Sequence, residues 1–110
     1  MNILENNSLK NRLKISALER RLFNIRHDNQ LLILLMVGSR ITPINRSALL
    51  KKLSCSEVSF RKYYNELAEL GLVEIIQSTS DRRKKLVGLT DIGREKLDMY
   101  EKSFALIIAS

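Results

Sequence analysis

The feature that most restricts the fold is a change of hydrophobic period at Gly71. Before it, residues 46–53 and 57–70 carry apolar side chains at three- and four-residue intervals, which predicts two short helices joined by a three-residue turn. After it, residues 72–77 and 85–89 are strand-like and flank a polar tip, which predicts one β-hairpin. Two such helices followed directly by a hairpin are typical of a winged helix-turn-helix.

The flanking segments add further elements. Periodicity over residues 8–25 predicts an amphipathic helix, and residues 29–37, apolar nearly all round, predict a helix at the centre of the core with Asp28 as its N-cap. Residues 41–44 are expected to be extended because proline restricts its neighbour, and residues 91–109 to form a long last helix. The predicted order is α-α-β-α-α-β-β-α, a mainly α fold with a small β-hairpin wing (α+β).

Three residues are expected to set the ends of the paired helices. Asn45 and Ser56 have side chains that accept hydrogen bonds from the first backbone N–H groups of a helix, so they are the predicted N-caps. Gly71 is the predicted terminator of the second helix, since glycine adopts the left-handed conformation common after a helix end.

The chain is strongly basic, with 19 Lys and Arg against 12 Asp and Glu and a formal charge of +7. Such an excess on a small protein favours a polyanionic partner, most often nucleic acid. In a winged helix-turn-helix the second helix of the pair, here 57–70, enters the major groove of double-stranded DNA. Arginine and asparagine suit guanine and adenine edges, and serines near a helix N-terminus suit a phosphate. The candidate reading residues are Ser56, Glu57, Ser59, Arg61, Lys62 and Asn65.

The hairpin tip, predicted over residues 78–85, carries four consecutive cations. In a strand their side chains would alternate, so about half would point at one ligand. A narrow minor groove attracts inserted arginine because its potential is strongly negative, which favours DNA contact by this wing. The alternative is solubilising charge on an exposed edge, just as helix 57–70 could be a helix with a solvated charged face. The candidate wing residues are Asp81, Arg82, Arg83, Lys84 and Lys85.

The wing and the residues after it resemble the MarR family of bacterial and archaeal transcriptional regulators. The family's most telling string, an Asp-x-Arg wing followed by Leu-Thr and a glycine, is matched by Asp81, Arg83, Leu89, Thr90 and Gly93. The resemblance spans about residues 29–97. It implies that Arg83 enters the minor groove, that Asp81 orients the wing through an ion pair and that helix 57–70 reads the bases.

The chain departs from the MarR pattern in its length. Most members have a further C-terminal helix, and many sense small molecules in a pocket between their lobes. This chain is closer in size to the compact SarA-like branch, which leaves a small-molecule effector open.

The last helix indicates a second copy of the chain. Its apolar residues recur at three- and four-residue intervals along about 28 Å, more than a domain this small covers. Burial against the same helices of a partner removes them from water, and a two-fold dimer sets two reading helices about 34 Å apart, one turn of DNA. The alternative is that the last helix folds back on the first within one chain. The expected dimer residues are Leu9, Leu13, Leu18, Leu22, Leu97, Tyr100, Phe104, Ile107 and Ile108.

These elements make up one predicted domain over residues 1–110. Within it we expect three parts. They are an N-terminal dimerisation helix (1–28), a winged helix-turn-helix core (29–90) and a C-terminal dimerisation helix (91–110).

Enzymatic, metal and cofactor chemistry lack the residues they need. The single His27 and the single Cys55 lie in no nucleophile or metal motif, and no glycine-rich phosphate loop is present, so we expect no enzyme, metal or cofactor. Cys55 is expected to pack inward, and a redox-sensing role for it stays open. The longest apolar run, residues 31–37, is too short to span a membrane, and the N-terminus lacks signal-peptide features, so we expect a cytoplasmic protein without membrane contact.

Three functions remain open from the sequence. The first is a sequence-specific transcriptional regulator, expected to be a repressor, that binds double-stranded DNA as a homodimer. The second is a DNA-binding protein of low sequence specificity with an architectural or replication role, and the third is a winged helix used only for protein contacts. Arg61, Lys62 and Asn65 on the reading helix favour the first, whereas the dense wing charge suits the first two equally.

Overall fold

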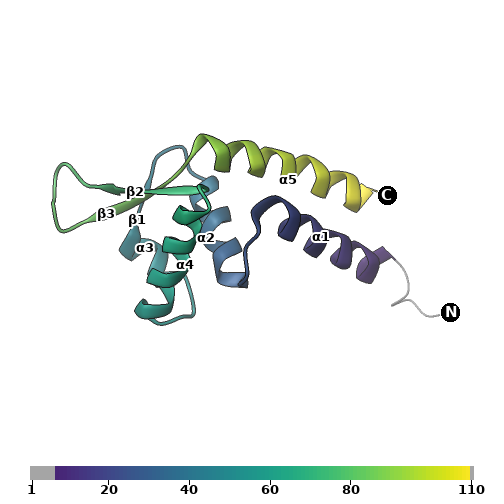
Figure 1. The fold of residues 1–110 in the computed structure, drawn as a ribbon, viewed down its shortest axis with the longest axis horizontal. Helices are drawn as coiled ribbons and strands as arrows, with labels where there is room; N and C mark the ends of the chain where they lie inside the picture. The colour runs from purple at the N-terminus through teal and green to yellow at the C-terminus, as the bar shows by residue number, and fades with distance from the viewer. Residues whose placement is uncertain (1–6, 110) are drawn as a thin grey trace.

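The computed structural model describes residues 7–109 and has its elements in the predicted order (Figure 1). They are α1 (Asn7–Phe23), α2 (Asp28–Gly38), β1 (Ile44–Asn45), α3 (Arg46–Lys51), α4 (Glu57–Glu69), β2 (Val73–Gln77), β3 (Lys85–Leu89) and α5 (Asp91–Ala109). The elements from α2 to β3 form a lobe, and α1 and α5 run antiparallel, side by side, as a two-helix arm on one side of it. The predicted winged-helix fold, mainly helical with a small sheet, is confirmed.

The two helices of the helix-turn-helix begin and end as predicted. Asn45 Oδ1 accepts the N–H of Ser47 at 2.8 Å and so caps α3. Ser56 Oγ accepts the N–H of Ser59 at 3.1 Å and caps α4. Each cap satisfies a backbone donor that the first turn of a helix leaves without a partner. Past the end of α4, Gly71 has a φ of +77°, a conformation that glycine adopts at little cost.

The N-cap of α2 is His27, so the prediction of Asp28 is wrong. His27 has an extended backbone (φ −142°, ψ 141°), and its Nδ1 accepts the N–H of Asn29 at 3.2 Å. Gln30 completes a capping box, because its Oε1 accepts the N–H of His27 at 3.2 Å. Asp28 is instead in the first turn of the helix, where its negative charge suits the positive end of the helix dipole.

The wing hairpin belongs to a three-stranded antiparallel sheet in the order β1-β3-β2. β2 pairs with β3 over their whole length, with Ile75 opposite Val87, as the predicted hairpin requires. The extended segment predicted over residues 41–44 ends in β1, which pairs with the other edge of β3 through Ile44 and Val87. A strand of two residues has no period that could reveal its partner, so this pairing was not predictable.

The core is centred on α2. Ile33, Leu34 and Val37 are at most 2% exposed and pack with the buried residues of α4 and the sheet. The outer face of α2 is less covered, since Leu32 and Leu35 are 47% and 37% exposed. The prediction of a central helix is therefore right for one face of α2 and wrong for the other.

The arm buries four of the residues that were expected at a dimer interface. They are Leu18, Leu22, Leu97 and Tyr100, each at most 9% exposed within one chain. The reason is that the apolar stripes of α1 and α5 meet inside the same chain, as in the fold-back alternative. These four are core residues of the single chain, which corrects their assignment. The other members of the set are Leu9, Leu13, Phe104 and Ile108, which are exposed, and Ile107, which is half-buried.

Tyr100 ties the two helices of the arm together through its hydroxyl, which donates to Glu19 Oε2 at 2.7 Å. Burial and the neighbouring Glu19 carboxylate raise the pKa of Tyr100 well above its ordinary value. Tyr100→Phe keeps the ring on Phe23 and removes this bond, and should lower the free energy of unfolding by about 1.5 kcal/mol in urea titrations. The same change at Tyr63, a partly exposed residue, is the control with a smaller expected effect.

The bond also gives stability a pH dependence with a defined sign. Because the folded pKa of Tyr100 is raised, the tyrosine of the unfolded chain ionises first. The contribution is therefore complete below about pH 10, the ordinary tyrosine value, and is lost as the pH rises above it. The difference in free energy of unfolding between the unchanged protein and Tyr100→Phe should therefore shrink above about pH 10. Equal stability of the two proteins at neutral pH, or a difference that stays constant above about pH 10, would contradict this account.

Candidate nucleic-acid interface

The outward side of α4 carries the residues predicted to read bases. Phe60, Tyr64 and Leu67 are at most 3% exposed and fix the helix on the core, which turns its opposite side to solvent. On that side Val58 is also exposed, at 81%. The exposed members of the predicted set are Ser56, Glu57, Arg61, Lys62 and Asn65, while Ser59 is half-buried.

Ser56 and Ser59 already serve the end of α4. Besides accepting the N–H of Ser59, Ser56 Oγ donates to Ser59 Oγ at 3.1 Å. A phosphate bound by these hydroxyls would have to share them with the N-cap. The predicted phosphate contact at this helix end therefore stays a prediction.

One cation beside this set was not predicted, Arg46, the first residue of α3. Its Nη1 donates to the hydroxyl of Tyr64 at 3.2 Å, and its Nη2 lies 3.8 Å from Glu57 Oε1. The same carboxylate oxygen is 3.5 Å from Arg61 Nη2. No spacing in the sequence marks Arg46 as part of the α4 surface, because α3 and α4 meet only in the folded chain.

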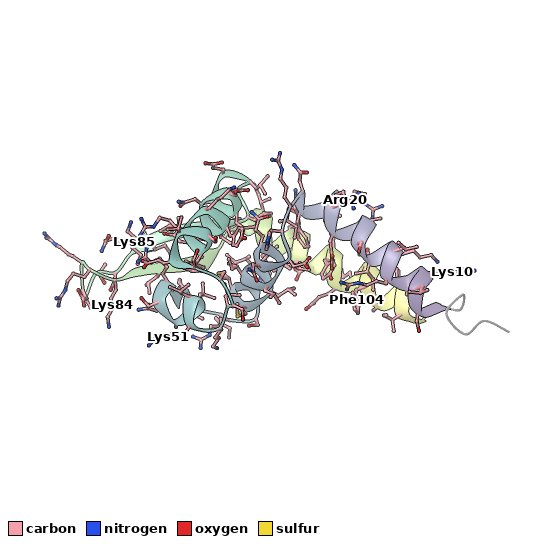
Figure 2. All side chains as sticks on the ribbon, turned by 90° about the horizontal axis from the view of Figure 1, so that it is seen from below. Lys10, Arg20, Lys51, Lys84, Lys85 and Phe104 are labelled. Atoms are coloured by element: carbon pink, nitrogen blue, oxygen red, sulfur yellow. The ribbon has the colours of Figure 1, made fainter. Side chains whose placement is uncertain are left out.

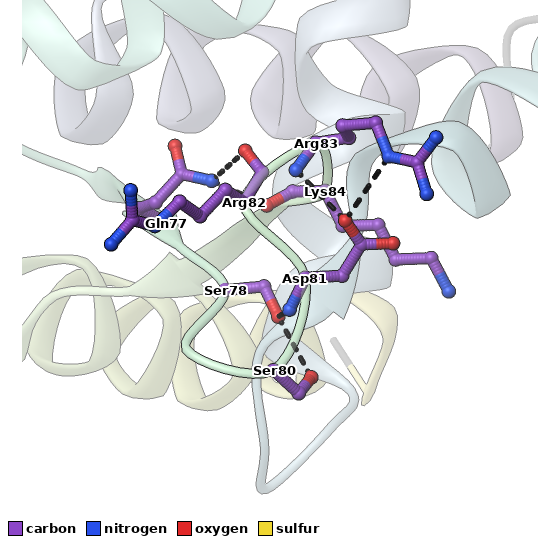
Figure 3. A network of polar contacts seen from close by, with 7 residues as sticks. All are labelled: Gln77, Ser78, Ser80, Asp81, Arg82, Arg83 and Lys84. Atoms are coloured by element: carbon purple, nitrogen blue, oxygen red, sulfur yellow. Dashed lines mark hydrogen bonds and ion pairs between the residues drawn. The ribbon is translucent and has the colours of Figure 1, made fainter.

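The wing tip is an ordered turn (Figure 3). Asp81 Oδ1 accepts the N–H of Arg83 at 3.0 Å and lies 3.5 Å from Arg83 Nε. Ser78 Oγ accepts the N–H of Asp81 at 3.3 Å, and the amide of Gln77 donates to the carbonyls of Arg82 and Lys84. These bonds fix the backbone of the tip, and the ion pair implied for Asp81 by the family resemblance is present, with Arg83 as its partner.

The wing cations all face solvent. Arg82, Arg83, Lys84 and Lys85 are exposed, and the side chain of Arg83 is 93% exposed although it is paired with Asp81. The expected alternation is wrong for the first three, because they lie in the turn and β3 begins only at Lys85. Figure 2 shows Lys84 and Lys85 on the wing and Lys51 at the end of α3, all on the lobe, whereas Lys10 and Arg20 lie on the arm.

Other kinds of site find little support in residues 7–109. No group of three or more His, Cys, Asp or Glu side chains in this range could hold a metal ion. Cys55 is half-buried against the core, as predicted. His27 is exposed at a helix end and stacks on Tyr63, with ring centroids 4.5 Å apart. Across the same range, every helix is too short or too polar to cross a membrane.

The fold matches several solved structures. The MepR–DNA complex of S. aureus covers 90% of this chain and 80% of its own, at a TM-score of 0.80 and 16% identity. MarR matches 92% of this chain and 80% of its own, at a TM-score of 0.66 and 20% identity. Overoxidized AbfR bound to DNA matches 88% of this chain and 71% of its own, at a TM-score of 0.67 and 22% identity. The chain has the MarR-type fold. No family model and no curated protein sequence matches it.

Within this MarR-type fold, residues 89–93, which connect β3 to α5, pack tightly against the turn after α4; we call this contact the joint. Thr90 Oγ1 donates to the carbonyl of Gly71 at 2.6 Å and accepts the N–H of Gly93 at 2.9 Å, so it caps α5 while holding the end of α4. A Cβ on Gly93 would overlap the carbonyl oxygen of Leu72. These contacts therefore fix the direction in which α5 leaves the turn that follows α4.

Proposed function

We propose that the protein binds double-stranded DNA as a homodimer and regulates transcription, with α4 in the major groove and the wing, residues 78–85, on the minor groove or backbone. The observation that carries this proposal is the exposure of cations on both elements of a MarR-type fold. MepR and AbfR, which share that fold, were each solved bound to DNA. The protein would work in the cytoplasm, as the sequence predicts, and we expect it to repress by occupying its site.

The chemistry of α4 suits base reading. Arg61 and Asn65 are exposed and lie one helical turn apart, so both can face one groove. Arginine pairs with two acceptors of guanine and asparagine with an acceptor and a donor of adenine, so the two side chains prefer different bases. Lys62 beside them adds charge that favours any phosphate nearby.

The wing suits a narrow DNA minor groove, where the electrostatic potential is strongly negative. Arg83 extends into solvent while its backbone is held by Asp81, so the side chain can reach a ligand without loosening the turn. Arginine is favoured in narrow minor grooves because the potential there is enhanced. The neighbouring lysines provide contacts to phosphates that do not depend on sequence.

The dimer part of the proposal rests on the arm. Leu9, Leu13, Phe104, Leu106 and Ile108 are 37–73% exposed there, and we call these five residues the arm patch. Apolar area removed from water contributes roughly 25 cal/mol per Å², so a partner that covers the patch stabilises both copies. The charges give a partner of the same sequence only small support, since α1 is rich in basic residues but α5 carries four acidic and three basic side chains.

The test is selection from genomic DNA. Purified protein is mixed with fragmented genomic DNA of its source at about 0.15 M salt, because lower salt exaggerates backbone binding, and the bound fragments are sequenced. Enrichment of a few fragments with inverted half-sites about one helical turn apart supports the dimeric regulator. Binding without enrichment favours the architectural or replication role, and absence of binding favours protein contacts.

Two single substitutions separate reading from backbone contact. Arg61→Ala should weaken binding to the selected site by about 1 to 3 kcal/mol and relax the preference at one base position. Lys84→Ala should weaken selected and random DNA alike and reduce the salt slope by about 1. Fluorescence anisotropy with both duplexes at three salt concentrations measures the two effects. Equal behaviour of the two variants on both duplexes would contradict α4 as the reader.

A further inference from the structure

The Glu57 carboxylate lies between two cations of the α4 surface, Arg46 and Arg61. Glu57 is the first residue of α4, and its side chain is 58% exposed. One of its oxygens lies 3.8 Å from Arg46 on α3 and 3.5 Å from Arg61 on α4. Both guanidinium groups of this cluster are thus occupied by the same anion, on the surface to which we assign DNA.

Folding alone gives a weak reason for this arrangement. Exposed ion pairs add little to stability because water and salt screen them, and the Glu57–Arg61 pair is more than half exposed on both sides. Ser56 already caps the helix, although an acid in the first turn also suits the helix dipole. For a polyanionic ligand the carboxylate is unfavourable, since it repels phosphate and offsets the charge of two arginines.

We propose that Glu57 is a specificity-determining residue that weakens binding to DNA in general and favours sites presenting a cytosine at its position. This inference rests on the proposed function. On most sequences the carboxylate keeps Arg46 and Arg61 from phosphates and meets no donor in the groove. Where a cytosine lies opposite it, the N4 amino group donates to the carboxylate, and the arginines are released to guanine or phosphate.

Arg46 extends the effect of Glu57 from α4 to α3. It is held between the hydroxyl of Tyr64 and the carboxylate of Glu57, with 26% of its side chain exposed. Loss of the carboxylate leaves the tyrosine bond in place and frees the other side of the guanidinium. A second cation thereby becomes available to the DNA backbone without any change in the fold of α3.

The test is Glu57→Gln, which keeps the size of the side chain and removes its charge. On random duplex DNA it should bind about threefold tighter or more near 0.15 M salt, and the salt slope should steepen by about 0.9 for each additional phosphate that the protein neutralises. In a selection from random duplexes, the cytosine preference at one position of each half-site should disappear or shift to adenine, which glutamine recognises. Thermal unfolding of both proteins shows whether the fold is kept.

The matched control is Glu69→Gln at the other end of the same helix. Glu69 is exposed and lies about 18 Å further along the axis, so its replacement removes the same charge from α4 without touching the cluster. Equal effects of the two variants on affinity, salt slope and selected sequence overturn the role of Glu57 and leave the proposed function standing. Absence of DNA binding by the unchanged protein overturns both.

Discussion

Replacing Gly93 by alanine should destabilise the protein by about 3 kcal/mol, because the added methyl group has no room. Its Cβ would overlap the carbonyl oxygen of Leu72 and crowd a methyl group of Leu89. The first of these is backbone, so relief requires that α5 move away from the turn after α4. Such a move also stretches the hydrogen bonds from Thr90 Oγ1 to the carbonyls of Gly71 and Leu72.

The sign of this effect is opposite to what helix propensity predicts. Gly93 lies inside α5, where alanine is ordinarily more favourable than glycine by about 1 kcal/mol. Overpacking outweighs this gain because a backbone oxygen cannot rotate aside as a side chain can. For a chain of this length, about 3 kcal/mol corresponds to a melting temperature lower by roughly 10 to 20 °C.

The control is the same substitution in the sheet. The three atoms nearest to a Cβ on Gly88 would be side-chain carbons, the closest being Pro43 Cγ at 3.3 Å, so a shift of a few tenths of an ångström makes room. Gly88→Ala should therefore change the melting temperature much less than Gly93→Ala in differential scanning calorimetry. A Gly93→Ala protein that melts at or above the unchanged protein would show that the joint is looser than the structure indicates.

Leu13→Lys should abolish the dimer and reduce affinity for the selected DNA site by about a hundredfold or more. Leu13 is 72% exposed in the single chain, so the folded chain tolerates a lysine there. In a two-fold dimer the substitution occurs in both copies, and it would bury two unpaired charges in the proposed interface. Joining two copies of α4 in one dimer raises the affinity for DNA by a factor of roughly 10² to 10⁴. This gain is lost when the two chains separate.

The choice of lysine removes an ambiguity. An added positive charge strengthens backbone binding if it acts on DNA at all, so weaker binding points to loss of the partner. Ile41→Lys is the control, because Ile41 is fully exposed and lies on the loop before β1, beside the first turn of α5 and at the other end of that helix from the arm patch. Light scattering and anisotropy are measured on both variants. A dimeric Leu13→Lys protein, or equal binding losses in the two variants, would contradict the proposed arm interface.

The outcome at Leu18 and Tyr100 explains why the dimer residues were only partly predictable. Apolar spacing identifies the buried stripe of a helix but not the helix that covers it. The stripes of α1 and α5 are covered by each other within one chain, so these two residues needed no partner copy. Leu13 and Phe104 remain 72% and 37% exposed, although the ring of Phe104 packs on that of Tyr100. Only the packing of the two helices distinguishes the groups.

The sequence by itself determined the order of the elements, the caps at Asn45 and Ser56, the turn at Gly71 and the cations of α4 and the wing. These follow from local chemistry: hydrophobic period, the backbone donors of a first helical turn and the conformational freedom of glycine.

Only the tertiary structure decided the pairing of β1, the placement of Arg46 beside Glu57 and the burial of the arm. Each of these is a contact between segments whose relative position no local pattern encodes, and therefore it exists only once the chain is packed.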